Sequence, residues 1–164
     1  MKDFYSVTKR SILNVAVFNI GLLVAFMVFG LSMPDSIKDR SIVGQITVLI
    51  VVLSLALSTI AISISLGKVV NGYRYKIERS GNKNLWAAYN VATGAIKRQV
   101  IYTGVFITLT LILYISFLID YWGLTTPASI LIVAMPIAGL TSCFFAWIKV
   151  HSCAKHDQEN LEPK

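Results

Sequence analysis

Residues 42–66 read IVGQITVLIVVLSLALSTIAISISL and contain no charged side chain. An α-helix needs about 20 apolar residues to cross the ~30 Å hydrocarbon core of a bilayer, so this stretch alone predicts a membrane span. Three similar stretches lie at 12–33, 100–119 and 128–148. The chain is therefore predicted to be an all-α membrane protein, a bundle of four transmembrane helices.

The composition supports the same class and a single domain. Of the 164 residues, 55% are hydrophobic and only 14% are charged, far less charge than a soluble domain of this size carries. Four spans leave no room for a separate soluble unit, so residues 1–164 are expected to form one polytopic membrane domain. The run at 12–33 is too long for a cleaved signal peptide and is expected to remain as a span. Short connections between spans one and two and between spans three and four favour antiparallel neighbours, an up-down-up-down bundle.

The distribution of basic residues predicts an orientation. Thirteen of the fifteen Lys and Arg residues lie in three segments, 1–10, 67–99 and 149–164, while only Lys38 and Arg40 lie on the other side of the spans. Positively charged loops stay in the cytoplasm. Both termini and the central connection are therefore expected in the cytoplasm, with the protein in the inner (plasma) membrane.

The connection at 67–99 is too long for a simple turn and is predicted to be a helical hairpin. Apolar residues recur at helical spacing on both sides of the turn signal Ser80-Gly81-Asn82: Val69, Val70, Tyr73, Ile77, Leu85, Tyr89, Ala92 and Ile96. Asn82 or Asn84 is a candidate cap for the second helix. Two arrangements remain open: the hairpin extends spans two and three beyond the membrane, or 85–96 lies flat on the membrane with Trp86 as an anchor.

This hairpin is the best candidate for a working surface. Its predicted interaction residues combine cations with aromatic rings: Arg74, Lys76, Arg79, Lys83, Trp86, Tyr89, Lys97 and Arg98. Two readings remain open, because such a surface attracts anionic lipid at the cytoplasmic face and equally suits a protein partner. Nucleic acid is not an expected partner, since the charge is explained by membrane orientation.

Two spans carry regular series of small residues. They are Ala134, Ala138, Ser142 and Ala146 in span four, and Ser54, Ser58, Ala61 and Ser65 in span two. Small side chains let membrane helices approach closely. These stripes are expected either to pack inside the bundle or to face a membrane-protein partner, including a second copy of the chain in a homo-oligomer.

The sequence offers little chemistry inside the membrane. No span has an ionisable residue in its interior, whereas ion and proton transport usually requires one. His151, Cys153 and His156 form a weak candidate metal cluster, but a structural zinc site needs a fourth ligand. No metal, no cofactor and no enzymatic activity are predicted.

Three function classes follow from these observations. The first is a non-catalytic protein that acts by contact within or beside the membrane, similar in build to bacteriocin immunity proteins, conjugation entry-exclusion proteins and accessory subunits of membrane complexes. The second is a small oligomeric carrier or channel lined by Ser and Thr hydroxyls. The third is a membrane-embedded enzyme on lipid or lipoprotein that uses Asp39 and Asp120.

Overall fold

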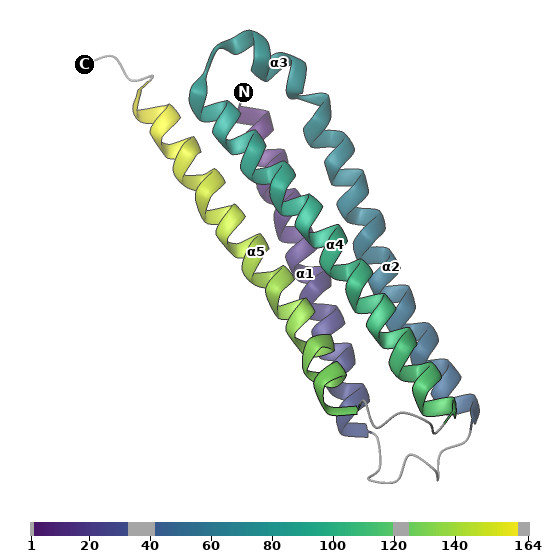
Figure 1. The fold of residues 1–164 in the computed structure, drawn as a ribbon. Coiled ribbons are helices and arrows are strands. Elements are labelled where there is room, and N and C mark those ends of the chain that lie inside the picture. The colour runs from purple at the N-terminus through teal and green to yellow at the C-terminus, as the bar shows by residue number, and fades with distance from the viewer. Residues whose placement is uncertain (1, 33–41, 120–124, 161–164) are drawn as a thin grey trace.

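The protein is all-helical in a computed structural model that describes residues 2–32, 42–119 and 125–160 (Figure 1). The elements are α1 (Lys2–Ser32), α2 (Ile42–Gly72), α3 (Arg74–Ser80), α4 (Lys83–Ile119) and α5 (Thr125–Glu159). Four of these helices are long and apolar enough to cross a membrane, which confirms the predicted class.

The four long helices form an antiparallel bundle in chain order. Helix α1 packs against α2 and α5, and α4 packs against the same two helices, so each helix has its chain neighbours beside it. The N-terminus, α3 and the end of α5 meet at one end of the bundle, called here the hairpin end, and the opposite end is called the far end (Figure 1).

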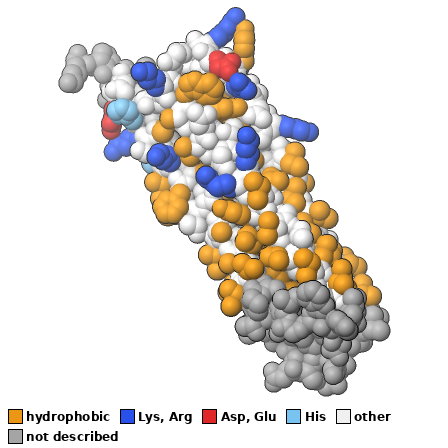
Figure 2. All heavy atoms as spheres, viewed as in Figure 1, with side chains coloured by type: hydrophobic (Ala, Val, Ile, Leu, Met, Phe, Trp, Pro, Cys, Tyr) orange, Lys and Arg blue, Asp and Glu red, His pale blue; other side chains and the backbone are white. Residues whose placement is uncertain are grey.

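The helices are longer than a bilayer is thick. They contain 31 to 37 residues, about 45–55 Å at 1.5 Å per residue. Side chains on the far half are mostly hydrophobic, whereas Lys and Arg gather toward the hairpin end (Figure 2). The bundle thus has an apolar half that suits hydrocarbon and a half with a polar surface.

The connection between α2 and α4 is built from helix almost throughout. Helix α2 ends where the Tyr73 N–H donates to the Val70 carbonyl at 3.1 Å, and α3 follows directly. Gly81 then adopts the left-handed conformation, with φ of 64°, which a glycine reaches without steric cost. Residues 85–96 belong to the same helix as the adjoining span, so they continue the bundle and do not form a separate helix lying on the membrane.

Two groups of buried apolar side chains hold the bundle together. The hairpin-end cluster includes Phe4, Ile12, Val70, Ile77, Leu85, Ala92, Ile96, Ala146 and Val150. The far-end cluster includes Leu22, Val52, Ala56, Phe106 and Ile132. The first cluster contains Leu85, Tyr89, Ala92 and Ile96, the residues whose spacing predicted this helical face.

Candidate functional site

A layer of neutral polar side chains lies between the two clusters. Gln99 is its centre: its Nε2 donates to the Thr103 hydroxyl at 3.3 Å, and its Oε1 accepts from the Cys143 thiol at 3.9 Å. Asn19 reaches the same place, because a Cβ added to Gly139 would lie 2.6 Å from Gln99 Oε1 and 2.9 Å from Asn19 Nδ2. The absent side chain of Gly139 therefore makes room for two amides from α1 and α4.

Helix α2 adds hydroxyl groups at about the same level. Gly67 of α2 faces Ile96 of α4. Because the two helices are antiparallel, the buried Ser63, one turn before Gly67, lies at about the height of Gln99, about one turn after Ile96. Ser63 Oγ and Asn19 Nδ2 are both buried without a hydrogen-bond partner among the described residues. The layer is thus buried and only partly satisfied, and each unpaired polar group in it costs free energy.

The side chains of this layer pack closely around one another. Asn19, Gln99 and Thr103 border a void in which no water molecule fits. The buried polar side chains of the described residues are all neutral amides or hydroxyls.

The tip of the hairpin is held in place by specific contacts. Ile77 and Leu85 are both 1% exposed and anchor the two sides of the turn in the core. Asn82 caps α4, since its Oδ1 accepts from the N–H groups of Asn84 and Leu85, while its Nδ2 donates to the Asp157 carboxylate of α5. The turn is thereby tied to a third helix.

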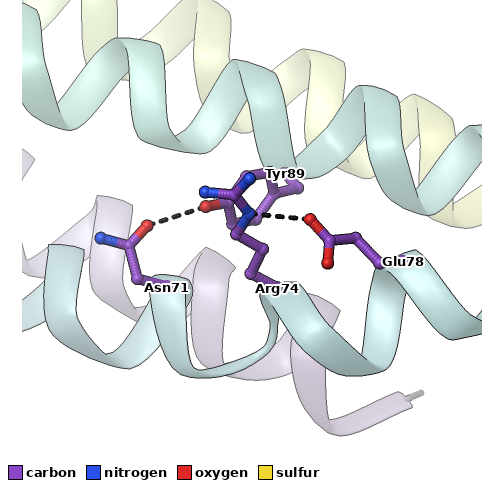
Figure 3. Close-up of polar contacts among 4 residues, drawn as sticks. All are labelled: Asn71, Arg74, Glu78 and Tyr89. Carbon is purple, nitrogen blue, oxygen red and sulfur yellow. Dashed lines mark hydrogen bonds and ion pairs between the residues drawn. The ribbon is translucent and has the colours of Figure 1, made fainter.

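A second bond joins the two arms of the hairpin. The Tyr89 hydroxyl donates to Asn71 Oδ1 at 2.8 Å, and Arg74 pairs with Glu78 at 2.8 Å nearby (Figure 3). Tyr89 is only 7% exposed, so it belongs to the interior of the hairpin and not to the outward surface on which the sequence placed it. Arg74 is exposed, but Glu78 neutralises its charge locally.

The outward face of the tip combines cations with uncovered aromatic rings. It is called here the tip surface and consists of Tyr75, Lys76, Arg79, Lys83 and Trp86. The Arg79 guanidinium lies 4.5 Å from the centre of the Tyr75 ring, and Tyr75 is 60% exposed. Trp86 is 37% exposed. Stacking on an aromatic ring limits the motion of the guanidinium, so this charge is presented in a defined position.

The remaining predicted cations lie well away from the tip. The exposed Lys97 and Arg98 are in α4, and Arg98 Nε donates to Ser142 Oγ of α5 at 3.2 Å. Together with basic residues of the other long helices they form a broad basic collar, spread over roughly 10–15 Å of the bundle's length at 1.5 Å per residue: Lys9, Arg10, Lys68, Lys97, Arg98 and Lys149.

The stripe on α2 faces outward. Its members Ser54, Ser58, Ala61 and Ser65 are all exposed, while Ala56, Thr59 and Ser63 fill the interior side of the same helix. Steps of four, three and four residues stay on one side of a helix with 3.6 residues per turn.

The stripe on α5 does not keep to one face. It begins at the exposed Ala134, passes through the half-buried Ala138 and Ser142, and ends at the buried Ala146. Successive steps of four residues rotate by about 40° each, so three steps carry the series from the surface into the core.

The candidate metal residues do not converge. His151 accepts a hydrogen bond from Lys9 Nζ at 2.8 Å and stacks on Trp147 with ring centres 6.0 Å apart. No three His, Cys, Asp or Glu side chains in the described part of the chain lie close enough to hold a metal ion. On α5, Cys153 and His156 share a face at a spacing of three residues, but His151 lies on the opposite side from Cys153.

The two aspartates of the enzyme alternative cannot be placed. Asp39 and Asp120 both lie outside the described residues. The described contacts therefore say nothing about the distance between the two carboxylates.

The chain was compared with protein-family models, curated proteins and solved structures, and none of them matches. Its function therefore has to be inferred from the chemistry of its own residues.

Sequence reasoning missed the centre of the polar layer. Hydropathy places Gln99 at the end of the connection, one residue before the span predicted at 100–119, and no motif singles out Gly139. A sequence signal was nevertheless present: the amides Asn19 and Gln99 both lie near the basic end of a span. The contact between α1, α4 and α5 that unites them needed the tertiary structure.

Proposed function

We propose that this protein is a non-catalytic inner-membrane protein that acts by contact, and that the tip surface binds an acidic, partly apolar face on the soluble part of a partner protein. The carrying observation is that Tyr75 is 60% and Trp86 37% exposed at the tip of a hairpin whose Ile77, Leu85 and Tyr89 are buried. Exposed aromatic residues beside Arg are the composition of binding hot spots.

The position of the tip favours a protein over the lipid surface. With the basic collar at the headgroups and both termini in the cytoplasm, as the positive-inside rule suggests, the tip projects into the cytoplasm. The helical path from Gly81 to Lys97 is about 24 Å, and the path to the level of Lys149, a collar cation nearer the tip, is about 12–15 Å, both at 1.5 Å per residue. Attraction to a charged membrane is screened over about 8 Å at physiological salt, so lipid attracts the tip far less than the collar.

A second contact surface belongs to the same proposal. The outward stripe on α2 offers small side chains to the bilayer, where a helix of a partner or of a second copy can approach closely. Immunity, entry-exclusion and accessory proteins of membrane complexes are the classes that act in this way.

The test is site-specific photocrosslinking in native membranes. A photoreactive phenylalanine analogue at Tyr75 is expected to form an adduct with another protein, whereas the same probe at Gln158, an exposed position of α5 at the hairpin end, is not. Arg79→Glu should abolish the Tyr75 adduct, and Arg10→Glu in the collar should leave it. Adducts with lipid alone, or with other copies of this chain alone, would refute binding of a partner at the tip.

A further inference from the structure

An open groove runs between α1 and α5 on the lipid-facing side of the bundle. It has a volume of about 540 Å³, within the range of small-molecule sites, and an almost entirely apolar lining. Ile12, Leu13, Ala16 and Ile20 form one wall, and Leu140, Phe144, Phe145 and Trp147 form much of the other. The groove belongs neither to the tip surface nor to the stripe on α2.

The end of the groove nearest the hairpin is rimmed by cations. Lys9 and Arg10 lie one helical turn above Leu13, and Lys149 lies one turn above Phe145. Lys9 Nζ donates to His151, whose ring stacks on Trp147 of the groove wall. The rim is therefore fastened to the apolar wall by two contacts.

No carboxylate competes for these cations within the neighbouring sequence. Segments 4–34 and 121–156, which contain both walls, have no Asp or Glu. A net positive rim above an apolar trough complements a molecule with an anionic head and a hydrocarbon chain.

The shape of the walls favours a lipid chain over a protein helix. Close helix packing in membranes uses small residues at the contact, as on the outward face of α2. Here the walls present bulky side chains, with Phe144 57% and Phe145 64% exposed. They line an open trough that a flexible chain can fill.

We infer that the α1–α5 groove is a binding site for one anionic phospholipid, with an acyl chain between α1 and α5 and its phosphate at Lys9, Arg10 and Lys149. This site is independent of the proposed function, because it uses none of the residues of the tip surface.

Native mass spectrometry of the purified full chain tests the site, with phosphatidylglycerol and phosphatidylcholine added in turn. One saturable phosphatidylglycerol adduct is expected. The double variant Arg10→Gln, Lys149→Gln should weaken it by about fivefold for each cation removed. The matched variant Lys76→Gln, Arg79→Gln removes the same charge at the tip and should leave binding unchanged. Both pairs lie on exposed positions, so folding is preserved.

A second variant tests the groove itself. Ala16→Phe fills the trough from the α1 wall and should displace the adduct, while Ala61→Phe on the exposed face of α2 should not. Equal binding of phosphatidylcholine, or an adduct indifferent to both Ala16→Phe and loss of the rim cations, would overturn the proposal. Crosslinking of a second copy of the chain at Phe144, in place of lipid, would also overturn the proposal.

Discussion

The two halves of the bundle use the same four helices in different ways. Toward the hairpin end the surface is polar, and large apolar side chains such as Phe4, Ile77 and Leu85 are buried. In the far half large apolar side chains cover the surface instead, with Val28 60% and Ile130 64% exposed. Water drives apolar groups inward, whereas lipid accepts them, so each half reflects its solvent.

The polar layer at the level of Gln99 lies inside the bundle, between the two buried clusters. Around Ile77 and Leu85 burial is driven by water, whereas beside the α1–α5 groove and in the far half the helices associate through packing and interhelical hydrogen bonds. Three predictions test this contrast, in order of expected effect.

Truncation of a buried isoleucine to alanine should lower the free energy of unfolding more in the hairpin-end half than in the far half. Ile77→Ala and Ile132→Ala each remove a side chain that is 1% exposed. Ile77→Ala should lower the free energy of unfolding by about 2–5 kcal/mol, because both the transfer from water and the cavity contribute. Ile132→Ala should cost less than about 2 kcal/mol, since lipid surrounds its unfolded reference state and only packing is lost. Denaturation in mixed micelles measures the free energy of unfolding of both variants. Equal decreases in the two variants would contradict the difference between the two halves.

Adding a single methyl group at Gly139, in the polar layer, should destabilise the bundle. Gly139→Ala places a Cβ against Gln99 and Asn19 and should destabilise the bundle by about 1–3 kcal/mol. Gly104→Ala is the control, because nothing lies within 4 Å of its added Cβ. That control should be neutral or stabilising by up to about 1 kcal/mol, the helix propensity of Ala over Gly. If Gly139→Ala matched Gly104→Ala, the close contact of the two amides would be disproved.

Loss of the cap at the tip should have the smallest effect. Asn82→Ala removes the acceptor for two backbone N–H groups and the donor to Asp157, and should cost about 0.5–2 kcal/mol. Asn82→Ser retains a capping hydroxyl and should recover part of the loss. Hydrogen exchange of residues 83–86 gives a local readout, and unchanged protection in Asn82→Ala would show that the cap does not hold the turn.

Much of the hairpin was predictable from local signals. The turn at Gly81 and the buried series from Leu85 to Ile96 follow from residue type and helical spacing, and of the two candidate caps, Asn82 and Asn84, the structure uses Asn82. The candidate site was less predictable. Tyr89 and Arg79 are both hairpin residues of the same predicted surface, but one is buried and the other exposed. Tyr89 is buried because its side of α4 faces α2, where it bonds to Asn71, whereas Arg79 lies on the side of α3 away from the buried Ile77.

The sequence by itself determined the class of this protein, because the length and hydropathy of a span are local properties set by bilayer thickness. Only the tertiary structure decided how the helix faces are used. It turned the small-residue stripe of α2 outward, carried that of α5 into the core, brought Asn19 and Gln99 together over Gly139, and opened a groove beneath the Lys9–His151 pair. These outcomes depend on the rotation of each helix about its own axis, which is set by contacts between residues far apart in the chain.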